Sequence, residues 1–218
     1  GLKFFFYRCL GYEWALFTKK KVAQPRQKRI PYVLPKDDCL SLIGAIRSPS
    51  YRLCCSVIYT LGLRIGEALS MKVNSIDSKQ MIVRIIGKGN KERVLPLPES
   101  LLRELRSFWQ THHDRKWLFP NKLGSNHLNR RYFYTAFGKA RKEAGLSPDF
   151  KPHCLRHCFA THLLTSGVEI HVVQMLMGHA NIKSTQIYTH QTEAMRDKLR
   201  KRLDDIFGNV FQRGQNNE

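Results

Sequence analysis

The sequence has few acidic residues, no long hydrophobic run and no export signal, and each absence excludes a class of protein. Its 218 residues contain 37 Lys and Arg against 17 Asp and Glu, so the net charge is +20. No run approaches the roughly 18 apolar residues that a membrane-spanning helix needs. Residues 1–17 are amphipathic but interrupted by charges, and they lack the small-residue cleavage site of a signal peptide. We therefore expect neither a membrane protein nor a secreted one.

A disulfide framework is also lacking. The six cysteines show no paired spacing: Cys9, Cys39, Cys54, Cys55, Cys154 and Cys158. Without an export signal, such cysteines are expected to be reduced thiols. The expected location is the cytoplasm.

Positive charge is the strongest global property of the chain. A protein this basic usually binds a polyanion, and nucleic acid is the first candidate, with a solvated basic surface as the alternative. The segment 18–29 is basic and polar and contains a proline, which is typical of a linker that can lie along a DNA backbone. Its candidate DNA-binding residues are Lys19, Lys20, Lys21, Arg26, Lys28 and Arg29. We expect residues 1–30 to be the end of an N-terminal domain plus this linker, and residues 31–218 to be one whole domain.

Hydrophobic periodicity predicts a mainly helical domain with one small antiparallel β-hairpin. Two β-rich runs, 81–86 and 92–97, flank a Gly-rich basic tip at 87–91. Gly167 and Gly178 are expected to end helical runs. Helices are expected at 35–46, 51–63, 98–113, 129–144 and 193–207, followed by a polar tail.

Residues 151–190 hold the densest group of potentially reactive side chains. His153, Arg156 and His157 fall at i, i+3 and i+4, on one helical face. Arginine can give a phosphate two parallel hydrogen bonds and keeps its charge, and histidine can donate a hydrogen bond or move a proton near neutral pH. Tyr188, downstream, can act as a nucleophile if a cationic pocket or a base activates it, although a core tyrosine is the ordinary interpretation. The target that suits such a group is a phosphodiester.

Two earlier segments carry further candidates, each with an ordinary explanation. Arg64 and Glu67 follow a glycine turn at i, i+3 and can form a surface ion pair. Lys88 and Lys91 lie at the predicted hairpin tip, where lysines are usually solvated but can also reach into a groove or an active site.

The predicted helix 129–144 is a third such segment. Arg130 and Arg131 lie there beside aromatic residues. This pattern suits an outer face that binds phosphates as well as it suits a solvated face.

A zinc site is the competing interpretation of residues 153–158. His153, Cys154, His157 and Cys158 are all of the zinc-ligand type. However, adjacent side chains on a helix diverge by about 100°, so the four cannot surround one ion. We expect no metal site.

The fragments together resemble the tyrosine recombinase, or phage integrase, family. In chain order they are LGLRIGEAL, a hairpin lysine in GKGNKERVLPL, HCLRH, LMGH and TQIYTH. The resemblance covers about residues 31–207 and implies the catalytic-domain fold of that family, mainly α with a small antiparallel sheet. Residues 1–30 would then be the C-terminal remnant of a core-binding domain.

The resemblance also implies roles for particular residues. Arg64 and Arg156 match the pair that clamps the scissile phosphate, and Glu67 matches an acidic residue that supports the site. All six family catalytic positions are present: Arg64, Lys88, His153, Arg156, His179 and Tyr188. Lys88 would be the acid for the leaving 5′ oxygen, the two histidines would support the site, and Tyr188 would be the nucleophile.

The implied function is site-specific recombination or integration of double-stranded DNA for a bacterial or phage mobile element. Strands would be cut and rejoined through a 3′-phosphotyrosyl link, without metal, ATP or another cofactor. A topoisomerase of the same chemistry and a catalytically idle DNA-binding relative are the alternatives.

The resemblance also implies a monomer in solution that forms a homo-multimer, a tetrameric synapse, on DNA. The helix expected at 193–207 can fold back on its own domain or pass to a neighbouring protomer, as relatives of this family often do.

Overall fold

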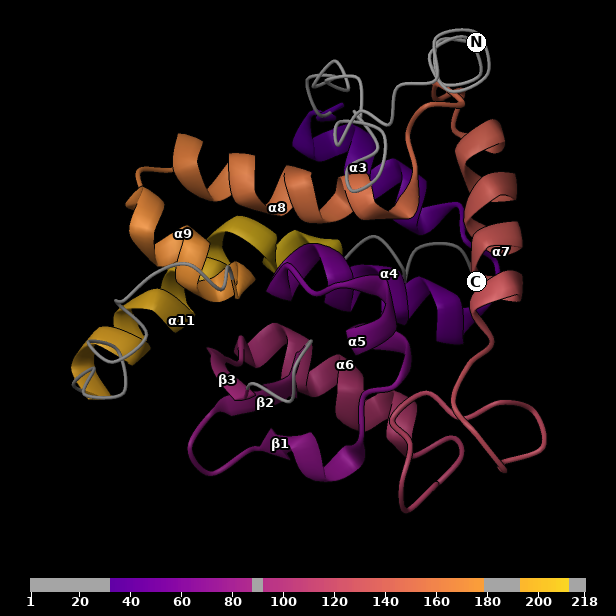
Figure 1. Ribbon diagram of the computed structural model, residues 1–218, viewed down its shortest axis with the longest axis horizontal. Helices are drawn as coiled ribbons and strands as arrows, with labels where there is room; N and C mark the ends of the chain where they lie inside the picture. Colours follow the sequence, from indigo (N-terminus) through magenta and orange to yellow (C-terminus); the bar gives the residue numbers. More distant parts are fainter. Residues whose placement is uncertain (1–31, 88–91, 179–192, 212–218) are drawn as a thin grey trace, which may run out of the picture. The chain divides into compact units, whose positions relative to one another are not determined.

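A computed structural model describes residues 32–87, 92–178 and 193–211 of the chain. It confirms the expected fold class: the domain is mainly helical, with one small antiparallel sheet at its edge (Figure 1). None of the described helices is long and apolar enough to cross a membrane. In chain order the elements are α3 (Lys36–Gly44), α4 (Pro49–Leu61), α5 (Ile65–Leu69), η2 (Val73–Ser75), β1 (Ile76–Asp77), β2 (Ile82–Ile86), β3 (Glu92–Pro96), α6 (Glu99–Trp109), α7 (Arg130–Glu143), α8 (Pro152–Thr165), α9 (Ile170–Met177), α11 (Glu193–Phe207) and η3 (Gly208–Val210).

The core forms where α8 packs against α4 (Figure 1). Every residue of α4 from Cys54 to Leu61 is buried, which explains why this segment is mainly apolar, with Ser56 and Thr60 as its buried polar residues. One polar chain crosses the packing: the Tyr59 hydroxyl lies 2.7 Å from His162 Nδ1, and His162 Nε2 lies 2.9 Å from the carbonyl oxygen of Leu34. A neutral imidazole satisfies both contacts if Nε2–H donates to Leu34 and Nδ1 accepts from Tyr59. These two hydrogen bonds of His162 fix the position of α8 and therefore of the other residues on this helix.

The sheet has the order β1-β2-β3 and is antiparallel throughout. The predicted hairpin is confirmed as β2 and β3, whose register runs from Ile82 opposite Pro96 to Ile86 opposite Glu92. Strand β1 was not predicted because two residues are too short to show a period of two. Ile85 is buried opposite Arg93, so the inward face of the hairpin carries a charged side chain.

Two glycines close the turns that bring the helices together. Gly62 ends α4 with φ +62°, and Gly178 ends α9 with φ +64°, the left-handed conformation that favours glycine. Gly167, which follows α8, has φ +85°. The expectation that Gly167 and Gly178 end helical runs is therefore confirmed.

The helix α11 packs on its own domain in this single chain. Leu203 and Phe207 are buried in the common core. Asp204 of α11 accepts hydrogen bonds from the backbone N–H groups of Glu99 and Ser100, at 2.7 and 3.1 Å, and so satisfies the free donors at the start of α6. Of the two placements left open by the sequence, this is the one in which the helix folds back.

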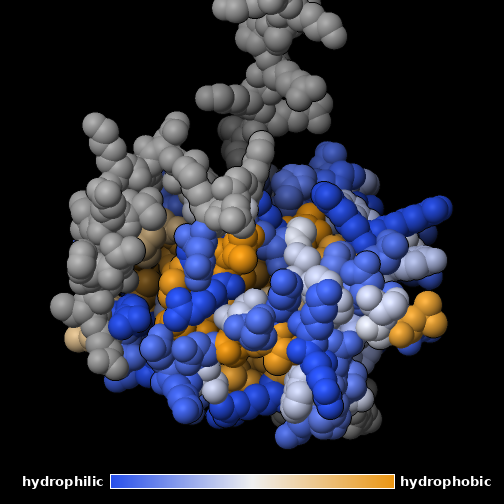
Figure 2. Space-filling model, turned by 60° about the horizontal axis from the view of Figure 1, so that its bottom comes forward, coloured by the Kyte–Doolittle hydropathy of each residue, from blue (hydrophilic) through white to orange (hydrophobic). Residues whose placement is uncertain are grey.

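Hydrophilic residues cover most of the face turned forward in Figure 2, with hydrophobic side chains reaching the surface between them. This agrees with the basic composition of the chain.

The close contact at Gly62 generates a stability prediction. A Cβ at this position would lie 2.4 Å from the Phe159 ring, and φ +62° would strain any L side chain. We expect Gly62→Ala to lower the free energy of unfolding by about 3 kcal/mol, from overpacking and strain together. Gly145→Ala is the matched control, because Gly145 has φ +67° but no atom within 4 Å of a Cβ, so only about 1 kcal/mol should be lost. Equal losses in urea denaturation would contradict the packing argument.

Candidate active site

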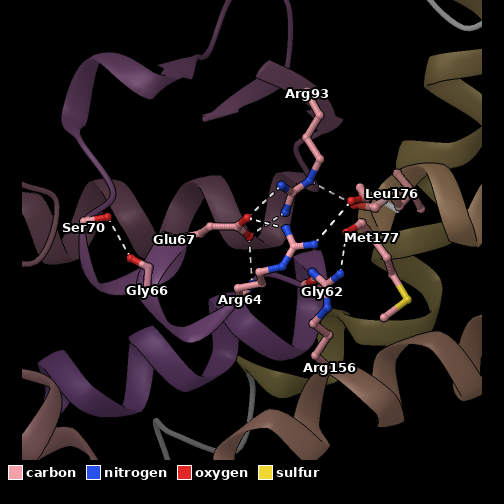
Figure 3. A network of polar contacts seen from close by, with 10 residues as sticks. Gly62, Arg64, Gly66, Glu67, Ser70, Arg93, Arg156, Leu176 and Met177 are labelled. Atoms are coloured by element: carbon pink, nitrogen blue, oxygen red, sulfur yellow. Dashed lines mark hydrogen bonds and ion pairs between the residues drawn. The ribbon is translucent and has the colours of Figure 1, made fainter. Parts of the chain in front are cut away.

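The site is organised around the first turn of α5. Arg64 precedes this helix, and Glu67 lies in it. The Glu67 carboxylate accepts a hydrogen bond from the Arg64 backbone N–H at 2.8 Å and an ion-paired one from Arg64 Nη1, also at 2.8 Å (Figure 3). The Glu67 side chain is only 7% exposed, whereas that of Arg64 is 44% exposed. The carboxylate therefore holds Arg64 from the buried side and leaves part of its guanidinium open to solvent.

Arg93, from β3, reaches the same carboxylate. Its Nη1 and Nη2 donate to the two oxygens of Glu67 at 3.0 and 2.7 Å, a fork-to-fork ion pair. Its Nε donates to the carbonyl oxygen of Leu176 at 3.2 Å. The Arg93 side chain is 11% exposed. The Nε, Nη1 and Nη2 atoms of Arg93 thus all donate to protein acceptors.

Three consecutive carbonyls at the C-terminal end of α9 each accept a hydrogen bond from a different arginine (Figure 3). Leu176 accepts from Arg93, Met177 from Arg156, and Gly178 from Arg64 at 3.3 Å. The last carbonyls of a helix lack intrahelical donors and carry the negative end of the helix dipole, so cations are favourable there. The end of α9 therefore gathers side chains from α8, β3 and the turn before α5 into one cluster.

Arg156 is the most deeply buried member of this cluster. It is 9% exposed, and its two Nη atoms donate to the carbonyls of Gly62 and Met177. Burial, together with repulsion from Arg64 and Arg93, lowers the pKa of Arg156 to about 10. The group is still protonated at neutral pH, and these two contacts leave three of its five N–H groups for a ligand.

The pKa of Glu67 is also lowered, but for a carboxyl group this shift favours the charged form. Burial by itself would raise its pKa, but the hydrogen bonds from Arg93 and Arg64 and the charge of Arg93 outweigh burial and lower the pKa to about 2. The carboxylate is therefore ionised throughout the physiological range. Three guanidinium groups and one carboxylate leave a local charge of +2, which suits an anion.

The other predicted catalytic residues are only partly placed. His153 is exposed at the start of α8, and its ring lies edge-on to that of His157, with centroids 5.8 Å apart. Lys88, His179 and Tyr188 lie outside the described residues. The structure thus brings Arg64 and Arg156 together, pairs Glu67 of α5 with Arg93 of β3, and places His153 on the same helix as Arg156.

Some of the predicted DNA-binding residues lie within the described part of the chain, and the others lie outside it. Arg130 and Arg131 lie exposed in the first turn of α7, where they line an open groove with Tyr134 and Thr135. Figure 1 shows α7 on the opposite side of the domain from α9, so these two arginines do not join the arginine cluster. Outside the described residues lie Lys19, Lys20, Lys21, Arg26, Lys28, Arg29 and Lys91.

The side chains considered as zinc ligands point in different directions. His153 is exposed, whereas Cys154 and Cys158 are buried, and the Cys158 sulfur accepts a hydrogen bond from the Leu34 backbone N–H at 3.3 Å. Across residues 32–87, 92–178 and 193–211, no three His, Cys, Asp or Glu residues group in a way that could hold a metal ion.

Sequence reasoning missed Arg93. The signal was present in the strand pattern, because Arg93 alternates with the buried Leu95 and Leu97 and so shares their face. A charged residue at an inward strand position needs a buried partner, and Glu67 is that partner.

Comparison with known proteins is consistent with this geometry. Residues 33–195 match the model of the phage integrase family. The tyrosine recombinase XerD of Yersinia pestis is 36% identical over 188 residues, which cover 77% of this chain and 62% of XerD. The y4qK protein of Sinorhizobium fredii is 34% identical over 189 residues, covering 86% of this chain and 61% of y4qK. The chain thus spans less than two thirds of the length of these relatives.

Solved structures show the same fold. The integrase of mycobacterium phage Brujita superposes with a TM-score of 0.68 at 25% identity, covering 96% of this chain and 73% of the integrase. The XerH site-specific recombinase, solved as a post-cleavage complex with its palindromic difH substrate, gives a TM-score of 0.64 at 26% identity, covering 84% of this chain and 55% of XerH.

The depressed pKa of Glu67 gives a prediction with a definite pH window. Because the folded pKa is lowered from 4.5 to about 2, the ionised carboxylate stabilises the fold above pH 4.5, and this contribution is lost as pH falls towards 2. We expect Glu67→Gln to lower the free energy of unfolding at pH 7 by about 2 kcal/mol, after allowance for solvent screening of Arg64. The difference from wild type should shrink as pH falls through the window.

Urea denaturation between pH 7 and pH 2 measures this difference. Glu92→Gln is the control, since Glu92 pairs with Arg84 at 3.6 Å on an exposed surface and should change stability little at any pH. A Glu67→Gln deficit that stays constant down to pH 2 would contradict the assignment.

Proposed function

Since this chain belongs to the phage integrase family, we propose that it is a tyrosine-type, site-specific DNA recombinase. The observation that carries the proposal is the arginine cluster, in which Arg64 and Arg156 bond to neighbouring carbonyls at the end of α9 while Glu67 steadies Arg64. Two clustered guanidinium groups, which keep N–H donors that no described residue accepts, match in a setting of net positive charge what a phosphodiester requires.

In the proposed reaction, Arg64 and Arg156 hold the scissile phosphate through its non-bridging oxygens. Negative charge grows on these oxygens when a nucleophile attacks phosphorus, so donors fixed in advance stabilise the transition state more than the ground state. The buried bonds of Arg156 to Gly62 and Met177 fix that donor before DNA arrives. No metal is needed for this step, because the guanidinium groups supply the positive charge.

The covalent step is assigned by resemblance to Tyr188. Its phenol loses a proton to a neighbouring base, its oxygen bonds to phosphorus, and the bond from phosphorus to the 5′ oxygen breaks. Lys88 gives that oxygen a proton, and His153 and His179 support the phosphate. A hydroxyl of a partner strand then reverses the step, so one phosphoester bond is exchanged for another and no ATP is required.

Double-stranded DNA is the proposed partner, and the cytoplasm of a bacterium, in the context of a mobile element, the proposed setting. The net charge of +20 and the basic segment 19–29 support this partner, as does the relative XerH, which was solved with its DNA substrate. We assign contacts to the DNA backbone to Arg130, Arg131 and Lys91 and to Lys19, Lys20, Lys21, Arg26, Lys28 and Arg29. A topoisomerase and a catalytically idle DNA-binding protein are the competing functions, and the next two experiments separate them.

The first experiment tests the covalent link. The purified chain is incubated with a nicked suicide duplex carrying its native target, identified beforehand by selection from random DNA. We expect a protein–DNA adduct that disappears in Tyr188→Phe, because this change removes only the attacking oxygen and should leave DNA binding intact. An adduct that persists in Tyr188→Phe would contradict the assignment, and a wild-type chain that binds DNA without forming an adduct would be the idle relative.

The second experiment tests assembly. We propose a monomer in solution that forms a tetramer joining two duplexes, because strand exchange needs a second duplex to supply the attacking hydroxyl. Sedimentation of the chain alone and with its target should show the mass of one chain and then of four chains with two DNA duplexes. A single chain on one duplex at every concentration, with religation of the original strand, would indicate a topoisomerase instead.

A further inference from the structure

The guanidinium of Arg64 is held by two acceptors that come from different parts of the chain. Its Nη1 donates to Glu67 Oε1 at 2.8 Å, and its Nη2 donates to the carbonyl oxygen of Gly178 at 3.3 Å. The Arg64 side chain is 44% exposed, so packing alone does not restrict its rotamers. The direction in which this guanidinium points therefore depends on where Glu67 and the end of α9 lie.

Arg93 contacts both of these acceptors. Its Nη1 and Nη2 donate to the two oxygens of Glu67 at 3.0 and 2.7 Å, and its Nε donates to the carbonyl oxygen of Leu176 at 3.2 Å (Figure 3). Its side chain also lies against Gly178, where a Cβ would be 3.0 Å from Arg93 Cδ. One side chain from β3 thus fixes the carboxylate of α5 relative to the end of α9.

Each oxygen of Glu67 accepts one hydrogen bond from Arg93 and one from Arg64. Oε1 accepts from the Nη1 atoms of both arginines, and Oε2 accepts from Arg93 Nη2 and from the Arg64 backbone N–H. The fork of Arg93 therefore sets the plane of the carboxylate that Arg64 meets. It also supplies a second positive charge, because Arg64 and Glu67 alone would form a neutral pair, which attracts an anion less.

We propose that Arg93 is a positioning residue that directs the guanidinium of Arg64 towards the DNA phosphate. The inference rests on the proposed function, in which Arg64 holds a non-bridging oxygen of that phosphate. Arg93 donates to protein acceptors and is only 11% exposed, so it acts through Arg64 and not on the DNA. Arg93→Lys keeps the charge but removes the fork, so it cannot hold Glu67 and the end of α9 together.

A double-mutant cycle tests whether Arg93 acts through Arg64. Adduct formation on the nicked suicide duplex is measured at saturating DNA in single-turnover conditions, which separates chemistry from binding. We expect Arg93→Lys and Arg64→Lys each to slow the reaction by about 10²-fold, because a misplacement of about 1 Å can cost that much. The double variant should be no more than about threefold slower than Arg64→Lys, because Arg93 cannot position a guanidinium that is absent.

Arg156 provides the comparison cycle. Its Nη1 donates to the carbonyl oxygen of Gly62, which none of the contacts of Arg93 within the described residues reaches. The effects of Arg93→Lys and Arg156→Lys should therefore multiply, to about 10⁴-fold. Arg84→Lys, the same change at a half-exposed position of the hairpin, is the control and should react like wild type.

Three kinetic outcomes would overturn the proposal. They are multiplied effects in the cycle with Arg64, equal coupling in the cycles with Arg64 and Arg156, and wild-type rates in Arg93→Lys. Equal coupling would show that Arg93 supports the whole cluster and not Arg64 in particular. Arg93→Gln, which keeps a donor towards Glu67, repeats the cycles if Arg93→Lys does not fold, and failure of both variants to fold would also overturn the proposal.

NMR of the chain labelled at its arginine nitrogens gives a second measurement that needs no reaction. An Nη group held by a carboxylate rotates slowly and gives separate N–H signals, and those of Arg64 are identified by their loss in Arg64→Lys. We expect Arg93→Lys to average these signals and Arg84→Lys to leave them unchanged. Unchanged Arg64 signals in Arg93→Lys would contradict the inference. A wild-type chain that shows the expected NMR response but forms no adduct would overturn the proposed function instead, so the two failures are distinguishable.

Discussion

The carboxylate of Glu67 is the group on which the rest of the site depends. Arg64, Arg93 and Arg156 come from three separate parts of the chain, and burial together with repulsion from the other two arginines lowers the pKa of Arg156. Glu67 bonds to two of the three and is itself almost buried. A buried carboxylate is favourable only when its charge is matched and its oxygens are hydrogen-bonded, and the two arginines and one backbone N–H meet that condition. Carboxylate and cations therefore stabilise one another, and none would be stable there alone.

The C-terminal end of α9 supplies the other hydrogen-bond acceptors for the three arginines. Three carbonyls and the negative end of a helix dipole face the three guanidinium groups. The arrangement requires backbone at close range, which explains the glycines: Gly178 lies against the stem of Arg93, and Gly62 lies against Phe159 while offering its carbonyl to Arg156. Gly62 of LGLRIGEAL and Gly178 of LMGH thus have a packing reason that can be read from the structure.

Much of this could be predicted from the sequence, and the remainder could not for physical reasons. Hydrophobic periodicity and capping residues are local properties of the sequence. They predict the main helices, the hairpin and the glycines that end α8 and α9. The i, i+3 spacing of Arg64 and Glu67 predicts a surface ion pair, whereas the Glu67 carboxylate is buried because β3 and α9 cover it. Arg93 was missed because its partners are 26 and 83 residues away, and sequence spacing carries no information about such contacts. The roles of Lys88, His179 and Tyr188 are still predictions from resemblance, since these residues lie outside the described ranges.

Acceptors of the protein itself hold the cluster together, and this bears on how it can act. Cations held only by a ligand would repel one another and move apart in its absence, so that binding would have to reassemble them. Here each guanidinium already has a protein acceptor, and the contacts of Arg64 and Arg156 use only some of their five N–H groups. In the proposed function, a phosphate adds hydrogen bonds to these groups without displacing Glu67 or the carbonyls of α9. Donors that are already fixed by protein contacts meet the condition for electrostatic catalysis that the proposed reaction requires, because their stabilisation is available as charge develops on the phosphate.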